Sequence, residues 1–126
     1  MVFNNGNQML RPYSTVTEFT PAMNADGSYD VPAKGAFGPS ELAWEYSPPE
    51  TEQFFSWFIS GAQRLPNGNT LVNHGAAAKI REVTAEGEIV WEYFFTTPDT
   101  QAPHGLFRAN RYPADHPGVI ALLNEG

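Results

Sequence analysis

The sequence predicts an all-β protein made of short antiparallel strands, and three observations lead to this prediction. The tripeptide Trp-Glu-Tyr occurs at 44–46 and again at 91–93, and each copy ends a segment in which apolar and polar residues alternate. Alternation with a period of two gives a β-strand one apolar face. Aromatic residues make up 13% of the chain, and glycine and proline contribute eleven residues each. This composition is typical of many short strands joined by many turns.

The two Trp-Glu-Tyr segments belong to a longer repeat. Residues 16–20, upstream of the first copy, match residues 80–84, upstream of the second. A repeat of about 40 to 50 residues built from four short strands is the sequence pattern of a β-propeller blade. We therefore predict a single partial β-propeller domain of antiparallel four-stranded, blade-like sheets, the alternative being a lone sandwich whose hairpins share a tripeptide by chance. The predicted parts are a blade at 1–50, a blade at 51–100, and the start of a further blade at 101–126.

Turn signals fix the hairpins of this domain. Asn67-Gly68, between two apolar runs, is a strong signal for a two-stranded hairpin. Residues 84–88 predict a second tight turn, because Gly87 can adopt a positive φ. The equivalent connection in the first blade is much longer, so residues 21–40 are predicted to be an insertion in a hairpin. Such insertions cost little stability and often carry function.

Charge and composition exclude several classes of function. Seven Lys and Arg stand against fourteen Asp and Glu, which gives a net charge of −7. This charge disfavours nucleic acid and anionic membranes as partners. The chain has no cysteine, which excludes a disulfide framework and a thiol nucleophile and leaves histidine as the plausible nucleophile. No signal peptide or transmembrane segment is expected from the sequence, and the compartment stays open.

Several motifs, in this order, resemble the arylsulfotransferase-like family of bacterial β-propellers. The resemblance rests mainly on residues 60–72 and 79–93. Residues 2–14 are similar to a stretch in the later half of such proteins, and residues 107–113 are similar to their C-terminal region. The resemblance covers most of residues 1–117, apart from the long insertion.

This resemblance implies a chemistry as well as a fold. Members of the family transfer a sulfuryl group from one phenol ester to another through a histidine in the propeller funnel, and further His and Arg residues hold the anionic oxygens. Many members are exported or periplasmic. No motif in this chain matches the surroundings of that histidine, so no catalytic residue and no cofactor are assigned. We expect a binding or scaffold module without catalytic activity by itself. The alternative is a sulfuryl-transfer enzyme in which an assembled ring places His74 or His104 in a funnel.

His74 is the first candidate for a ligand contact. It ends the strand that follows the Asn-Gly turn, and the small residues at 75–78 come next. Strand ends of this kind line a propeller funnel, and small residues let a ligand approach closely. The alternative is a histidine in a surface turn.

A second candidate site lies further along the chain. His104, Arg108 and Arg111 together predict a site for a small anionic or aromatic ligand. The alternative is a loop histidine beside two solvated arginines. His116, between Asp115 and Pro117, is typical of a turn and is given no functional role.

The remaining charged residues of the best-matched motifs are predicted to be architectural. We expect Arg64 to point to a neighbouring blade and pair with a glutamate of a Trp-Glu-Tyr strand, Glu45 or Glu92. These two glutamates recur with the repeat, which favours a structural role over acid and base catalysis.

Residues 24–30 alternate oxygen-bearing side chains, as calcium loops do. The glycine, Gly27, is fourth from Asn24 instead of sixth, and Gly35 stands where the bidentate glutamate belongs. We therefore predict no metal site.

The length of the chain predicts a partner. Two blades alone leave two aromatic faces in water, and repeat units of this kind need about three copies to be stable. The chain is a fragment of a larger propeller, a subunit of a ring, or a re-closed sandwich. We expect self-association into a ring as a cyclic homo-oligomer.

Overall fold

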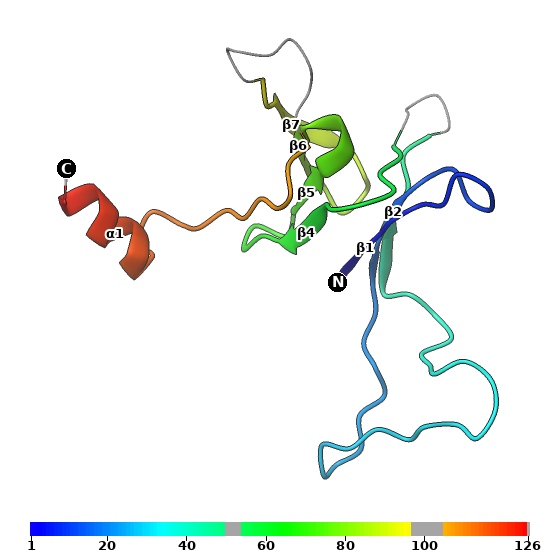
Figure 1. The fold of residues 1–126 in the computed structure, drawn as a ribbon. Helices are drawn as coiled ribbons and strands as arrows, with labels where there is room; N and C mark the ends of the chain where they lie inside the picture. Colours follow the sequence, from blue (N-terminus) through cyan, green and yellow to red (C-terminus); the bar gives the residue numbers. More distant parts are fainter. Residues whose placement is uncertain (50–53, 97–104, 126) are drawn as a thin grey trace.

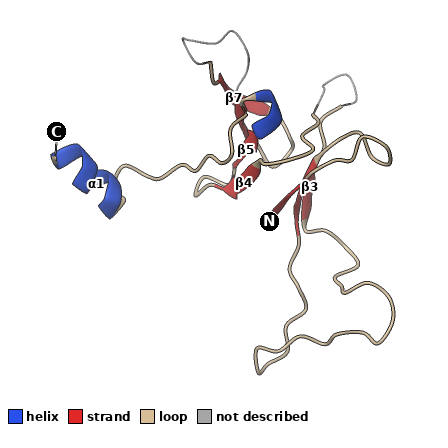
Figure 2. Cartoon of the chain, in the orientation of Figure 1, coloured by secondary structure: helices blue, strands red, loops and turns tan. Residues whose placement is uncertain are grey.

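The computed structural model describes residues 1–49, 54–96 and 105–125 (Figure 1). The regular secondary structure of these residues is mostly β, as predicted, with one short α-helix that the sequence patterns did not predict (Figure 2). The elements are β1 (Val2–Asn4), β2 (Thr15–Glu18), β3 (Trp44–Tyr46), β4 (Gly61–Arg64), β5 (Thr70–His74), the 3-10 helix η1 (Gly75–Ala77), β6 (Lys79–Val83), β7 (Ile89–Phe94) and α1 (Pro117–Asn124).

The strands form two antiparallel sheets in which each strand pairs with the next along the chain. Sheet 1 has the order β1-β2-β3, and sheet 2 has the order β4-β5-β6-β7. The prediction of four strands per sheet holds for sheet 2, whereas sheet 1 has three strands within the described residues. The strands of these residues do not close into a ring or barrel.

The repeated tripeptide marks a structural repeat. Glu18 lies opposite Trp44 in the β2–β3 ladder, and Glu82 lies opposite Trp91 in the β6–β7 ladder. The tryptophan and tyrosine rings of each tripeptide stack in the same way, with centroid distances of 6.3 Å in β3 and 6.2 Å in β7. Equivalent residues of the two sheets therefore occupy equivalent ladder positions.

Both predicted tight turns are confirmed. The N–H of Leu65 donates to the carbonyl oxygen of Asn69 at 2.8 Å, and Gly68 has a φ of 87°. In the second turn the N–H of Thr84 donates to the carbonyl oxygen of Glu88 at 2.9 Å, and Gly87 has a φ of 89°. Glycine suits both positions because it has no Cβ to clash at positive φ.

The hydrophobic core lies between the two sheets. Val16 and Tyr46 of sheet 1 pack with Val72 and Val83 of sheet 2, and Phe54 of the connection between the sheets completes the cluster. Each of these side chains is less than 5% exposed. Full burial of one such side chain stabilises the fold by about 1.5 to 3 kcal/mol, so this layer holds the sheets together.

A chain of serine hydrogen bonds fixes the connection before β4. Ser56 is fully buried, its N–H donates to Ser14 Oγ at 2.9 Å, and its own Oγ accepts from Ser60 Oγ at 2.8 Å. Ser60 Oγ in turn accepts from the N–H of Gly75 at 3.0 Å. These bonds hold Ile59 and Ser60 at φ values of 51° and 85°, a conformation that costs a non-glycine residue about 1 to 3 kcal/mol.

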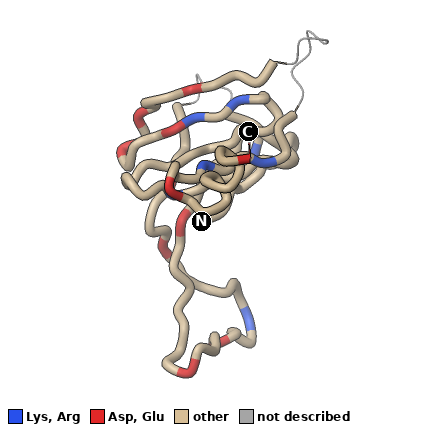
Figure 3. The backbone as a smooth tube through the Cα atoms, turned by 90° about the vertical axis from the view of Figure 1, so that its left-hand side faces the viewer, with Lys and Arg blue, Asp and Glu red and all other residues tan. Residues whose placement is uncertain are grey.

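Two segments extend away from the sheets. The insertion at 21–40 leaves the end of β2 as a long, almost wholly exposed loop and returns to β3 (Figures 1 and 3). Residues 105–116 lead to α1, which lies apart from both sheets (Figure 1). His116 is the N-cap of this helix, and its Nδ1 accepts from the N–H of Gly118 at 3.1 Å. Proline at the first helical position, Pro117, was the available sequence signal for α1.

Candidate functional site

His74, the first predicted ligand contact, is held by main-chain and aromatic contacts. It ends β5 and is only 2% exposed. Its Nε2 lies 3.0 Å from the carbonyl oxygen of Phe55, and because a carbonyl accepts only, Nε2 carries the proton. The ring of Phe54 meets the imidazole edge-on at 5.0 Å. The imidazole is thus held in a fixed orientation, and its Nε2 is hydrogen-bonded to the main chain.

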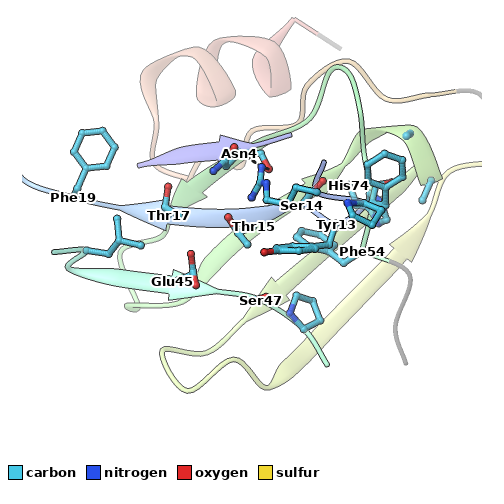
Figure 4. A pocket seen from close by; sticks show the side chains of 17 residues that line it. Asn4, Tyr13, Ser14, Thr15, Thr17, Phe19, Glu45, Ser47, Phe54 and His74 are labelled. Carbon is cyan, nitrogen blue, oxygen red and sulfur yellow. Dashed lines mark hydrogen bonds between the residues drawn. The ribbon is translucent and has the colours of Figure 1, made fainter. Parts of the chain in front are cut away.

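His74 lines a pocket, a groove of about 1120 Å³ on sheet 1 (Figure 4). Val16 and Tyr46 point into the core, so the residues that alternate with them in β2 and β3 point to the opposite face. That opposite face forms the floor of the groove, and His74 lies at one end beside Tyr13 and Phe54 (Figure 4). The floor residues are Thr15, Thr17, Glu45 and Ser47.

The lining of the groove mixes polar and apolar residues and carries both signs of charge. Arg11 lies in its lining, and its Nη2 donates to Asn4 Oδ1 and to the carbonyl oxygen of Asn5, both at 2.6 Å. The guanidinium also lies 5.2 Å from the centre of the Tyr13 ring. The Arg11 guanidinium is therefore engaged by groups of the protein, and Glu45 adds a negative charge to the lining. For these two reasons the groove does not have the cationic character of an anion-binding site.

The residues of the second predicted site lie in separate places. Arg108 is exposed and lines a smaller pocket of about 460 Å³ between β1, the start of β4 and residues 107–110. Arg111 lies against sheet 2, where it forms an ion pair with Glu82. His104 lies outside the described residues. Among the described candidates, His74, Arg108 and Arg111 are therefore not brought together.

Arg64 has the predicted structural role, but its predicted partner is wrong. The structure pairs Arg64 with Glu18 of β2 instead of Glu45 or Glu92. Glu18 lies opposite Trp44 and on the same face of sheet 1, whereas Glu45 points to the other face because neighbouring strand residues alternate. The guanidinium of Arg64 lies 4.5 Å from the centre of the Trp44 ring, so the arginine links β4 to sheet 1.

The same arrangement occurs twice, which the motifs alone did not reveal. Arg111 pairs with Glu82 and lies 5.2 Å from the centre of the Trp91 ring. The two arginines have the same 47-residue spacing as the two tryptophans. This spacing was the sequence signal that could have predicted the second arrangement. We name these groups the first Arg–Glu–Trp cluster (Arg64, Glu18, Trp44) and the second Arg–Glu–Trp cluster (Arg111, Glu82, Trp91).

Glu82, the acid of the second cluster, accepts hydrogen bonds from three side chains. Its Oε1 accepts from the side-chain amides of Asn69 at 2.7 Å and Asn67 at 3.0 Å, and its Oε2 pairs with Arg111. These contacts, with Asn69 as the largest cause, hold the pKa of Glu82 below its ordinary value of 4.5. Glu82 is therefore ionised and structural at neutral pH.

Glu92 is also structural, as predicted from its recurrence. Its carboxylate forms ion pairs with Arg81 and Lys79, two residues of the neighbouring strand β6. Arg81 lies directly opposite Glu92 in the ladder. The pair therefore fixes β7 against β6.

The calcium-like segment of the insertion satisfies its own oxygens. Asn24 Nδ2 donates to Ser28 Oγ at 3.0 Å and to Asp30 Oδ1 at 3.1 Å. Ser28 donates through Oγ and N–H to Asp26 Oδ1, and these bonds lower the pKa of Asp26. Within the described part of the chain, no group of three or more His, Cys, Asp or Glu side chains could hold a metal ion.

The comparisons with known proteins do not place this chain in a family. No family model, curated protein or solved structure matches it. Of the helices among the described residues, none has the length and hydropathy needed to cross a membrane.

Proposed function

We propose that this chain is a propeller-type binding and scaffold module, related to the arylsulfotransferase-like family, that has no catalytic activity by itself and assembles through a repeated interface. The repetition of the Arg–Glu–Trp cluster carries this proposal. The first cluster joins sheet 1 to sheet 2. The second cluster lies on the other side of sheet 2, where no further sheet covers it within the described residues.

Burial of the repeated aromatic residues supports an interface at this uncovered face. Tyr46 of sheet 1 is 4% exposed because sheet 2 covers it, whereas the equivalent Tyr93 of sheet 2 is 49% exposed. Trp91 is exposed as well, whereas Trp44 is half-buried and donates from Nε1 to the carbonyl oxygen of Ala85, in the turn between β6 and β7, at 2.7 Å. Exposed aromatic clusters of this kind mark protein–protein contacts.

The groove on sheet 1 is the complementary face. Arg81 lies opposite Val72 in the ladder, so it points from sheet 2 toward sheet 1. The repeat places Thr17 of sheet 1 at the position equivalent to Arg81, and Thr17 lines the groove. The groove is thus the counterpart of the surface that sheet 2 presents to sheet 1. The uncovered face of sheet 2 in one copy can therefore contact the groove of another copy. This head-to-tail arrangement closes into a ring when the rotation between copies allows it.

The site geometry favours a non-catalytic role. A histidine nucleophile needs a ring nitrogen that reaches substrate and cationic donors that hold the anionic oxygens. His74 commits Nε2 to the carbonyl oxygen of Phe55, and Arg111 is engaged by Glu82. Arg108 lines a different pocket from His74.

An assay of sulfuryl transfer tests the chemical part of the proposal. We expect the wild-type chain, incubated with an aryl sulfate donor and a phenol acceptor, to transfer no more sulfuryl group than a protein-free control. Wild-type transfer that is lost in His74→Ala or His104→Ala, but kept in the helix-cap variant His116→Ala, would establish the enzyme alternative instead.

Light scattering tests the assembly part. A mass that is a multiple of the 13.9 kDa chain is expected at micromolar concentration. A constant mass of one chain over the accessible concentration range would contradict the scaffold proposal.

A further inference from the structure

The β1 edge of sheet 1 lacks an equivalent of β4, the strand that sheet 2 has at the corresponding edge. In sheet 2, β4 pairs with β5, which in turn pairs with β6. In sheet 1, β1 holds the position of β5, since it pairs with β2 as β5 pairs with β6. Within the described residues no strand pairs with the other side of β1. An edge of this kind presents main-chain N–H and C=O groups to an incoming strand.

Residues 105–112 have the contacts of such a strand but no sheet of their own. Asn5 Nδ2 donates to the carbonyl oxygen of Ile59 at 3.0 Å, just before β4. Asn73 Nδ2 donates to the carbonyl oxygen of Leu106, also at 3.0 Å, and Leu106 stands 47 residues after Ile59. Arg111 likewise stands 47 residues after Arg64 of β4 and repeats its cluster. The segment therefore lies against sheet 2 as β4 lies against sheet 1.

The segment is held away from the β1 edge of its own chain. Gln63 Nε2 donates to the carbonyl oxygen of Arg111 at 2.9 Å, and Gln63 Oε1 accepts from the N–H of Arg111 at 2.8 Å. The N–H of Leu106 also donates to the carbonyl oxygen of Gly75 at 2.9 Å. These bonds hold residues 106–111 on sheet 2, and the smaller pocket separates them from β1.

We infer that residues 105–112 of one copy pair with β1 of a second copy and complete its sheet 1 as a fourth strand. This inference rests on the self-association proposed above. Each copy has a segment with the contacts of this strand but without a sheet, and a sheet without that strand, so the two surfaces complement each other head to tail. The same step places the uncovered Trp91 and Tyr93 face of one copy toward the groove face of the next. The occupant of the β1 edge is thus a second copy of this chain.

The ladders give the register of the new pair. Ala109 stands 47 residues after Ala62, which pairs with Val72 in sheet 2. Val2 occupies in the β1–β2 ladder the position that Val72 occupies in the β5–β6 ladder. Ala109 of one copy is therefore expected opposite Val2 of the other.

The absence of cysteine allows a direct cross-linking test. Val2→Cys and Ala109→Cys chains are mixed in equal amounts and oxidised, because a disulfide requires Cβ atoms about 3.5 to 4.5 Å apart. We expect a disulfide-linked dimer in the mixture and much less in either variant alone. The control pairs Ala109→Cys with Ser28→Cys in the exposed insertion, and no dimer is expected from it. Light scattering is run on each mixture before oxidation.

The outcomes separate this inference from the wider proposal. A multimer by light scattering that gives no 2–109 cross-link overturns strand donation and leaves the scaffold proposal standing. A monomer overturns both. Hydrogen exchange on the wild-type chain gives a second measurement, should a cysteine variant fail to fold. Protection of residues 2–4 and 105–112 that increases with protein concentration supports strand donation, and unchanged protection of both segments overturns it.

Discussion

Arg64 and Glu18 form an ion pair that joins β4 of sheet 2 to β2 of sheet 1. The guanidinium of Arg64 also lies over Trp44 and donates from Nη1 to Thr70 Oγ1 at 2.6 Å. The ion pair alone is partly exposed and worth less than about 1 kcal/mol. Its importance comes from the ring contact that the same side chain makes across the sheet interface and from the hydrogen bond to Thr70, which holds the side chain in place within sheet 2.

Replacing Arg64 is expected to destabilise the fold more than replacing its repeat equivalent. Arg64→Ala should lower the free energy of unfolding by about 1 to 2 kcal/mol, through loss of the ring contact and the hydrogen bonds. Arg111→Ala should cost less, since it joins a tail to sheet 2 and its side chain is more exposed, at 42% against 30%. Urea denaturation followed by tryptophan fluorescence measures both values. A larger loss for Arg111→Ala would show that the first cluster does not hold the sheets together.

Glu82 is expected to make stability depend on acid pH. Hydrogen bonds from Asn69 and Asn67, together with Arg111, hold the folded-state pKa below 4.5. The ionised carboxylate therefore stabilises the fold fully above the unfolded-state value, and this contribution is lost as the pH falls through the lowered pKa. Glu82→Gln should thus be less stable than wild type at pH 7, and the difference should shrink as the pH falls below 4.5.

Denaturant midpoints of wild type and Glu82→Gln between neutral and acid pH measure this effect. Glu86→Gln, in the exposed turn between β6 and β7, is the matched control and should follow the wild-type curve at every pH. A difference between wild type and Glu82→Gln that stays constant with pH would rule out the ionised carboxylate as its cause.

The hairpins were predictable because their signals are local. Asn67-Gly68 and Gly87 specify turns within a few residues, and the alternation around each Trp-Glu-Tyr specifies which residues share a strand face. The repeat also predicted one non-local feature, namely that the Trp-Glu-Tyr strand pairs with the equivalent preceding strand in both sheets. The repeat did not predict that sheet 1 has one strand fewer than sheet 2 among the described residues. A local strand signal does not reveal which sheet edge the strand joins.

The contacts between the sheets were not predictable in the same way. Whether Arg64 meets Glu18 or Glu45 depends on which face of sheet 1 turns toward β4, and alternation within one strand does not decide this. The burial of His74 depends on Phe54 and Phe55, which a separate connection brings to the end of β5. Arg111 was grouped with Arg108 by its position in the chain, and Glu82, 29 residues away, engages it instead.

Trp91 and Trp44 should separate assembly from folding. Trp91→Ala removes a large exposed ring from the uncovered face of sheet 2, so we expect weaker self-association and an unfolding midpoint close to wild type. Trp44→Ala removes the bond from Nε1 to the carbonyl oxygen of Ala85 and a ring packed against the core, so it should destabilise the fold by about 2 to 4 kcal/mol. Sedimentation velocity and urea denaturation give the two readouts. An unchanged sedimentation profile for Trp91→Ala would contradict the proposed role of this face.

The insertion at 21–40 should be removable without loss of the fold. It extends from the sheets, and its described contacts, such as the Tyr29–Phe37 ring pair at 6.1 Å and the turn around Asn24, lie within the loop itself. Closing a shorter loop costs less chain entropy, and a halving of loop length is worth only about 0.6 kcal/mol. Replacing residues 21–40 with the Ala-Glu-Gly sequence of the β6–β7 turn is therefore expected to leave the unfolding free energy unchanged or slightly raised. Urea denaturation and circular dichroism check this, and a strong destabilisation would show that the loop packs on the sheets and supports them.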